Sequence, residues 1–483
     1  MAINTNNRRN EEQHTGPWQH IIGGLWRTPL GLFGVILTTV SITLMLVGLL
    51  LDLLGFIENT YANLFTYMVL PAGMVTGLAI IPLAAWLRRR QWNRFGISRE
   101  HLHINLSDKR HRKGIILFTV LTVVNLTVLS LIAYEGYHYT ESPTFCGKVC
   151  HQVMDPEFTA YSRSAHSKVA CVECHIGSGA EWFVRAKISG LRQVLAVFTD
   201  SYSRPIPSPV EHLRPSRDTC EECHWPEKFH GKKVRTINHY TDDNQTEPTT
   251  TNIQLHIGGR NPETDIFEGI HWHVSHGVEI KYLAADDKRT QIARVRIKRA
   301  DNSVDEFVKD GIAIPADKVE NWRVMDCTDC HSRPTHIFDM PEDVVDFGLR
   351  SKKINGAIPG IREDSFKVLT SAYGSRDEAG EKIGPDLLRL QSARNPDLSA
   401  GRKLEIQKAG AYLVEGYLNN VWPNMNVTWG TYQSHIGHRS QNFGNYKYAD
   451  TRFGCFRCHD EEHSNKDGKT ISQYCGLCHD EPE

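Results

Sequence analysis

The 483-residue sequence lacks an excess of charge of either sign, because 55 Lys and Arg residues oppose 56 Asp and Glu residues. It also lacks nucleotide-binding and hydrolytic motifs, and nothing in it indicates a nucleic-acid partner. It is instead rich in cysteine and histidine, with 12 and 24 residues, and its long apolar runs gather in the first 134 positions. This composition argues against a wholly soluble cytosolic enzyme.

No cysteine stands alone: the 12 cysteines fall into six pairs, and a histidine directly follows each pair. The first pair is one residue wider than the others, with Cys146, Cys150 and His151. The other five have the spacing C-x-x-C-H, and they are Cys171, Cys174 and His175; Cys220, Cys223 and His224; Cys327, Cys330 and His331; Cys455, Cys458 and His459; and Cys475, Cys478 and His479.

This spacing is the attachment signature of haem c, in which two cysteine sulfurs bond the porphyrin and the histidine is an axial ligand of the iron. Zinc sites and disulfides would not require a histidine after every pair. The sequence therefore predicts six covalently bound haem c groups, and we expect the wider first motif to disturb the usual histidine geometry. Because haem c is attached outside the bacterial inner membrane, the chain from about residue 137 onward is predicted to be exported.

Three long stretches contain no charged residue: 30–51, 64–87 and 114–134. Each is long enough to cross a hydrocarbon layer of about 30 Å as a helix, so we predict three transmembrane helices. The loop 88–113 is rich in Lys and Arg, whereas the loop between the first two stretches contains neither. By the positive-inside rule, the N-terminus and the basic loop lie in the cytoplasm, and the third helix leads into the periplasm.

The sequence thus predicts a membrane-anchored multihaem cytochrome c with a mostly helical or irregular, haem-packed periplasmic domain. Apolar and polar residues alternate in 278–283 and 292–298, with a turn at 300–303, which indicates a small β-rich insertion. The final segment is too short to build a core from side chains, so its haems are predicted to form that core. The predicted parts are a cytoplasmic tail, 1–28; a three-helix anchor, 29–134; a three-haem module, 135–230; the β-rich insertion, 231–326; the fourth haem motif with a helical region, 327–454; and a two-haem C-terminal segment, 455–483.

The second axial ligand of each iron must come from outside the motif. Thirteen exported histidines follow no cysteine pair, and six irons need at most six of them. Met154, three residues after His151, is either an axial ligand of the first haem or a packing residue. His273 is an alternative to His271, and His438 is an alternative to His435, because each pair shares a local spacing. The predicted distal ligands are His166, His239, His271, His336, His435 and His463.

The segment from Phe145 to Lys187 resembles the NapC/NirT/NrfH family of membrane-anchored multihaem cytochromes. The likeness covers roughly 114–230 and consists of a helix, the first motif with Met154, a Ser-x-His at His166, the second motif, and a Trp followed by Lys187. The resemblance implies a Met-ligated first haem against the membrane and quinol oxidation beside Lys187, with Asp200 in place of the family's acidic residue. Three predicted membrane helices and the wider first motif depart from the family, whereas the length and six motifs look like its enlarged, ImcH-like branch.

We therefore expect an inner-membrane quinol dehydrogenase that takes electrons from quinol, such as menaquinol, and passes them on in anaerobic respiration. Its expected partners are membrane lipid, the quinone pool, and periplasmic cytochromes or a terminal reductase. One alternative is a haem electron-transfer subunit of a larger respiratory complex that does not meet quinone itself. Another is a catalytic multihaem reductase, which needs an iron with an open position. An altered motif such as C-x-x-C-K, typical of such enzymes, is absent from the sequence.

Overall fold

The computed structural model describes two units, which cover 1–149 and 150–483 and are treated separately. The predicted cytoplasmic tail, most of the loop 88–113, and Cys150 fall outside the described residues. The described residues are 29–53, 62, 65–94, 107, 109–149, 151–176, 180–210, 213–224, 229–241, 248–261, 263, 267–432, 434–438, 442–443, 446–447 and 454–480.

The first unit contains three long helices, α2 (Pro29–Leu53), α4 (Leu70–Arg94) and α5 (Lys109–Glu141). A π-helical turn, η1 (Phe65–Val69), leads into α4, and a second one, η2 (Phe145–Val149), follows α5. Among the described residues, two stretches are long and apolar enough to cross a membrane, Pro29–Asp52 and Phe65–Ala84. The third predicted stretch lies within α5, and its crossing of the membrane stays a prediction.

Helices α2 and α4 pack closely because small residues line their interface. A Cβ atom added at Gly77 would lie 2.8 Å from the carbonyl oxygen of Gly34, and one at Gly73 would lie 2.9 Å from Oγ of Ser41. Membrane helices commonly associate through such small residues, since these let the two backbones approach. The packing therefore suits a pair of helices surrounded by lipid.

The second unit begins with α6 (His151–Ser162), α7 (Cys171–His175), α8 (Ala180–Phe198) and α9 (Ser216–Cys220). Residues of the first three haem motifs lie in α6, α7 and α9, and the longer α8 carries none. A long antiparallel hairpin follows, made of β1 (Lys232–His239) and β2 (Thr249–His256), and then a two-residue pair, β3 (Gly259–Arg260) with β4 (Phe267–Glu268). A 3-10 turn, η4 (Ile270–Val274), precedes the main sheet.

The main sheet has five antiparallel strands in the order β11-β7-β6-β5-β8. Its inner face buries Ile280, Tyr282, Val295 and Phe307. Strands β5 and β6 lie where apolar and polar residues alternate in the sequence. The edge strand β11 comes from the C-terminal segment, so residues of 231–326 and of 455–483 pair in one sheet. The strands are β5 (Glu279–Ala284), β6 (Ile292–Lys298), β7 (Val304–Lys309), β8 (Arg323–Val324) and β11 (His463–Ser464).

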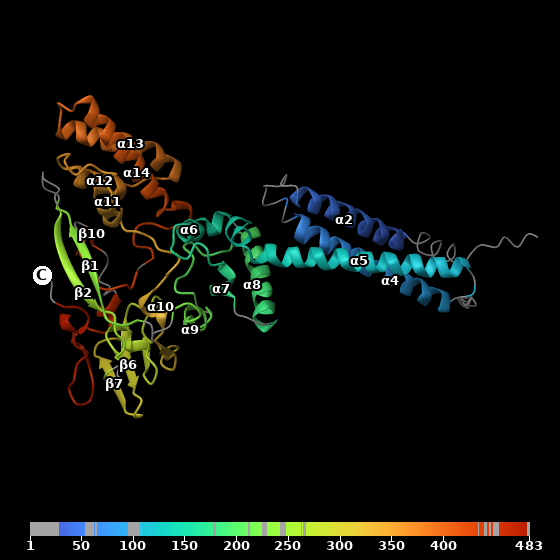
Figure 1. The fold of residues 1–483 in the computed structure, drawn as a ribbon, viewed down its shortest axis with the longest axis horizontal. Coiled ribbons are helices and arrows are strands. Elements are labelled where there is room, and N and C mark those ends of the chain that lie inside the picture. The colour runs from blue at the N-terminus through green and yellow to red at the C-terminus, as the bar shows by residue number, and fades with distance from the viewer. Residues whose placement is uncertain are drawn as a thin grey trace, which may run out of the picture. The chain divides into compact units, whose positions relative to one another are not determined.

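The region after the fourth motif has its own side-chain core. The motif turn α10 (Cys327–Cys330) is followed by α11 (Pro341–Arg350), α12 (Ile361–Thr370), α13 (Arg376–Arg394) and α14 (Ala400–Leu418), which Figure 1 shows grouped together. Leu369, Ile383 and Leu413 are fully buried between these helices. The remaining elements are short: η5 (Pro423–Met425), β9 (Asn442–Phe443), β10 (Tyr446–Lys447), η6 (Gly454–Arg457) and η7 (Cys475–Leu477).

One carboxyl group of this helical region is buried without a hydrogen-bond partner from another residue. Glu342, in the first turn of α11, is 4% exposed, and burial raises the pKa of its carboxyl to about 7. In an unfolded chain the same group has a pKa of about 4.5. Folding therefore favours the protonated form, and the stability this provides is present below pH 4.5 and lost as the pH rises to 7.

We expect the helical region to lose up to about 3 kcal/mol of stability between pH 4.5 and pH 7 for this reason. Glu342→Gln should remove that pH dependence and stabilise the protein at neutral pH. Urea unfolding followed by the helical circular-dichroism signal measures both effects. Glu381→Gln, at an exposed position of α13, is the matched control. An equal pH dependence in wild type and Glu342→Gln would contradict the assignment.

Candidate haem centres

Each C-x-x-C-H motif is folded as a single helical turn. The backbone N–H of the motif histidine donates to the carbonyl oxygen of the first cysteine in the third to sixth motifs, for example from His331 to Cys327 at 2.8 Å. In the second motif the whole sequence from Cys171 to His175 is the helix α7. Residues three apart in such a turn lie on one side, so both sulfurs face the same way. None of the eleven described cysteines forms a disulfide.

Four motif histidines face a second histidine at one recurring distance. The ring centres are 5.9 to 6.2 Å apart in all four cases. Two imidazoles bound to opposite sides of one metal by bonds of about 2 Å place their ring centres roughly 6 Å apart. The pairs are His175 with His336, His224 with His166, His459 with His273, and His479 with His438.

Hydrogen bonds orient several of these rings. Nδ1 of His336 donates to the carbonyl oxygen of Glu157 at 2.9 Å, and Nδ1 of His273 donates to that of Ile270 at 2.9 Å. Because a carbonyl oxygen only accepts, Nδ1 carries the proton and Nε2 is left with its lone pair, as a metal-bound histidine requires. Motif histidines His459 and His479 are oriented in the same way, with Nδ1 bonded to the carbonyl oxygens of Ser472 and Asp480.

The surroundings of His336 also fix its position and keep it neutral. Arg333, three residues before it, forms an ion pair of 2.6 Å with Glu157 of α6, so the loop that carries His336 is fastened to that helix. Burial lowers the pKa of His336 and of its partner His175, while the Glu157 carboxylate opposes this effect at both rings. Neutral imidazole is the form that binds iron. The facing rings and their lowered pKa values therefore fit a haem between them.

The fourth motif lacks a ring partner at this distance among the described residues. Burial lowers the pKa of His331, and the nearby rings of His271 and His224 add to the effect. His271 has the orientation of a ligand, because its Nδ1 bonds the carbonyl oxygen of Ile257 at 3.0 Å. It also stacks on Phe229 with ring centres 4.7 Å apart. We retain His271 as the proposed ligand for this site.

Both members of each alternative pair from the sequence are now placed. His271 and His273 lie on the same 3-10 turn, η4, and His273 is the one whose ring faces a motif histidine. His438 faces His479, whereas His435 is buried and its backbone N–H donates to Oγ of Ser332. Burial, with Arg457 nearby, lowers the pKa of His435 to about 3. The spacings His-x-His and His-x-x-His indicated both histidine pairs in the sequence. They could not indicate which histidine of each pair would face a motif histidine.

Two predicted ligands, His239 and His463, face no motif histidine in the part of the chain that the structure describes. His239 ends β1, is exposed, and lies opposite Thr249 in the hairpin. His463 is completely buried, with Nδ1 bonded to the Asp460 carboxylate at 2.9 Å and Nε2 bonded to the carbonyl oxygen of Ile292 at 3.0 Å. Since both ring nitrogens hold hydrogen bonds, the structure disfavours His463 as a ligand, and ligation by His463 stays a prediction to be tested. Its role is to join β11 to the main sheet.

Replacing His463 by glutamine should therefore leave every haem low-spin while destabilising the protein. The lost buried hydrogen bonds cost about 1–3 kcal/mol, which lowers the temperature of unfolding. Absorption and electron paramagnetic resonance spectra of the variant measure the spin state, and calorimetry measures the stability. A new high-spin haem in the variant would restore His463 to the ligand set.

The first motif is only partly described. Cys146 lies in η2, Cys150 lies outside the described residues, and so does the side chain of His151, which begins α6. Met154 is half-buried in α6, one residue before Asp155, whose carboxylate accepts a 2.8 Å hydrogen bond from Trp422. The choice between His151 and Met154 as axial ligand stays a prediction.

The two residues predicted at the quinol site do not form one cluster. Lys187 lies in the middle of α8, and Asp200 follows the end of that helix at Phe198. The eleven residues that follow Lys187 up to Phe198 rise roughly 16 Å along the helix. Asp200 is bonded to Arg204, which also contacts the ring of Tyr202. A quinol site at Lys187 would therefore need another acid than Asp200.

The motifs contact one another in sequence order. Helix α7 of the second motif contacts α9 of the third, and α9 contacts α10 of the fourth, where Ser216 and Thr328 hydroxyls are 3.1 Å apart. Arg457 of the fifth motif donates to the carbonyl oxygen of Asp329 in the fourth. Phe456 of the fifth motif stacks at 4.5 Å on His438, the ring partner of the sixth. Sites two to six therefore form a continuous series.

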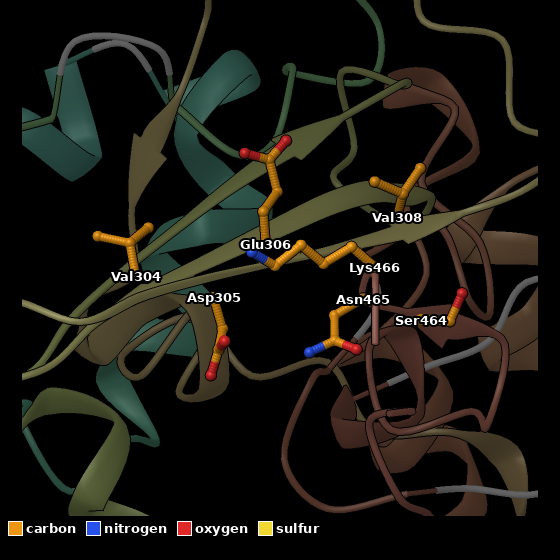
Figure 2. Close-up of a pocket in the computed structure, with 7 residues that line it drawn as sticks. All are labelled: Val304, Asp305, Glu306, Val308, Ser464, Asn465 and Lys466. Carbon is orange, nitrogen blue, oxygen red and sulfur yellow. The ribbon is translucent and has the colours of Figure 1, made fainter. Parts of the chain in front are cut away.

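Figure 2 shows a hollow beside strand β7. It is formed where β7 meets the segment after β11, and it is lined by Val304, Asp305, Glu306, Val308, Ser464, Asn465 and Lys466. Asp305 and Glu306 are paired with arginines of β6 and the following turn, Arg299 and Arg296. None of the lining residues belongs to a haem motif.

The chain is similar to known c-type cytochromes. Residues 108–206 match the NapC/NirT cytochrome c family, N-terminal region. The chain is 38% identical over 463 residues to the cytochrome c-type protein ImcH of Geobacter sulfurreducens (strain ATCC 51573 / DSM 12127 / PCA), a match that covers 95% of this chain and 88% of that protein. No solved structure matches the chain. The chain is thus an ImcH-like member of the NapC/NirT family of membrane cytochromes, which carry covalently bound haem c and transfer electrons.

Proposed function

We propose that this cytochrome oxidises quinol at the inner membrane and carries the electrons through six haems to a periplasmic acceptor. The observation that carries the proposal is the series of contacting motifs, four of which have two facing histidines. An iron with both axial positions filled exchanges electrons but has no open position for a substrate. The arrangement therefore supports a conduit rather than a catalytic reductase.

The proposed ligand set follows from these contacts. The first haem takes His151 or Met154, and the fourth takes His331 with His271. At the other four sites, the second histidine comes from a segment that is far in the sequence from the motif. Each iron, when bound, would therefore join two segments of the chain. These sites take His175 with His336, His224 with His166, His459 with His273, and His479 with His438.

The haems, when bound, supply one-electron transfer, and the protein supplies the quinol site. Quinol oxidation releases two electrons and two protons, so the site needs a nearby haem, access from lipid and a polar group at the quinol oxygen. Lys187 is the proposed polar group, because its helix follows the second motif and presents apolar residues beside it. A lysine ammonium donates hydrogen bonds to such an oxygen.

The proposed placement has the N-terminus and the loop 88–113 in the cytoplasm and the haem domain in the periplasm, after three membrane crossings. The asymmetry of Lys and Arg between the loops supports this orientation. A soluble periplasmic cytochrome or a terminal reductase is the proposed acceptor of the electrons. Quinone of the membrane, including menaquinone, is the proposed source.

Lys187→Met tests the quinol site directly. We expect reduction of the purified protein by a menaquinol analogue to slow at least tenfold, because the variant keeps the length of the side chain but loses its charge and hydrogen bonds. Dithionite should still reduce all haems in the variant, and mass spectrometry should find the same haem content of six. Stopped-flow absorption measures the rate.

Lys408→Met is the matched control, since Lys408 is exposed on α14 in the helical region. Its rate of quinol-driven reduction should equal that of the wild type. An unchanged rate in Lys187→Met would remove Lys187 from the site. Failure of the wild-type protein to accept electrons from any quinol would instead favour a haem subunit of a larger complex.

A further inference from the structure

Helix α8 carries a row of exposed apolar side chains. Leu191 is 71% exposed, Leu195 is 63% exposed and Phe198 is 85% exposed, and Val184 and Ile188 continue the row toward the start of the helix. The spacings of three and four residues place all five on one side, here called the α8 apolar face. Contiguous apolar surface of this kind marks a contact with another partner or with lipid.

The flank of the α8 apolar face carries positive charge. On the opposite side of the helix, Trp182 and Ala186 are half-buried and Gln193 is exposed. Arg185 and Arg192 are exposed and lie three residues before Ile188 and Leu195, which makes them a basic row along the edge of the apolar one. The helix sequence contains three basic residues and one acidic residue.

This helix is unsuited to crossing a membrane and suited to lying on one. Its 19 residues would extend about 28 Å, but Arg185, Lys187 and Arg192 interrupt every apolar run long enough to span. An amphipathic helix with basic residues beside its apolar face binds at the headgroup level, with the apolar side chains between the acyl chains. The same chain contains two helices long and apolar enough to cross a membrane, and such an anchor would keep α8 close to a bilayer.

We propose that α8 is an interfacial helix, whose apolar face enters the leaflet on the haem side of the membrane. Arg185 and Arg192 lie at the level of the anionic lipid headgroups, which their charge complements. The haem domain is thereby fastened to the bilayer surface at a second place, in addition to its membrane helices. This inference rests on the membrane anchor and does not depend on quinol oxidation.

Photocrosslinking in the full-length, haem-loaded protein tests the proposal. p-Benzoylphenylalanine is placed at Leu191, and the protein is reconstituted into vesicles of phosphatidylethanolamine and phosphatidylglycerol. Irradiation should produce protein–lipid adducts that mass spectrometry detects. The control position is Gln193, which is exposed on the same helix but away from the α8 apolar face and is bonded to Ser189. We expect at least fivefold less adduct there.

Two results would overturn the proposal. Equal lipid adduct at Leu191 and Gln193, or none at either, would mean that the face does not enter the bilayer. Adducts between two protein chains at Leu191 would mean that the face is a contact between copies. The label at Leu195 repeats the test if the first variant does not take up its haems. Quinol-driven reduction measured in the same vesicles distinguishes these failures from failure of the proposed function.

Discussion

Replacing His336 by alanine is expected to turn one haem of the protein from low-spin to high-spin. The ring of His336 lies 6.2 Å from that of His175 and keeps Nε2 directed away from its hydrogen bond to Glu157. Its removal leaves the second haem with the motif histidine alone, and water or nothing in the sixth position. The effect is large because no described histidine ring other than His336 lies within contact distance of His175.

Absorption and electron paramagnetic resonance spectra of the oxidised protein measure this change. The haem content by mass should stay at six, since the cysteines are untouched. His239→Ala is the control, because His239 is an exposed histidine of the same domain and lies in a hairpin. An all-low-spin spectrum in His336→Ala, or a high-spin haem in His239→Ala, would require a different assignment of ligands.

Replacing Asp329 by alanine is expected to give the largest loss of stability in the haem domain. Asp329 lies between Cys327 and Cys330 and is only 3% exposed. Its carboxylate accepts hydrogen bonds from Tyr282 at 2.6 Å and from Arg323 at 3.1 Å, so it fastens the fourth motif to strands β5 and β8. Burial, with the charge of Asp329 beside it, raises the pKa of the Tyr282 hydroxyl and keeps it a donor.

Alanine would leave buried donors without an acceptor, which costs about 3–5 kcal/mol when a buried charged pair is broken. Thermal unfolding followed by circular dichroism measures the loss, and mass spectrometry shows whether the fourth haem is still attached. Asp329→Asn is the control, because it keeps the shape and one acceptor oxygen and should lose clearly less. Equal stability of Asp329→Ala and wild type would show that the network does not hold the motif.

Local patterns in the sequence were sufficient for the haem motifs and the first apolar helices. A C-x-x-C-H turn depends only on residues within five positions, and a membrane helix depends only on its own composition. The strands β5 and β6 also follow from their own alternation. Such elements can be predicted from a short stretch of sequence, because their formation does not depend on residues far away in the chain.

The ring pairs could not be predicted in this way. His175 and His336 are separated in the sequence by the hairpin and most of the main sheet. His273 comes from the β-rich insertion and His459 from the C-terminal segment. Proximity to a motif suggested His463, but Asp460, three residues before it, binds the ring instead. The spacing Asp-x-x-His, visible in the sequence, is a signal for a hydrogen bond within the segment.

The exchange of strands and histidines between distant segments has a consequence for how the protein is made. Strand β11 closes the sheet from the C-terminal end, and His273, the proposed partner of His459, precedes it by the second half of the insertion and the whole of residues 327–454. Thioether bonds form within each short motif, so under the proposed periplasmic placement they can be made while the chain is still crossing the membrane. The sheet edge, and the motif histidines that face His273 and His438, come only with the last residues of the chain. Such long-range closure slows folding, so we expect His273 and His438 to stay without their partners until the last two motifs arrive.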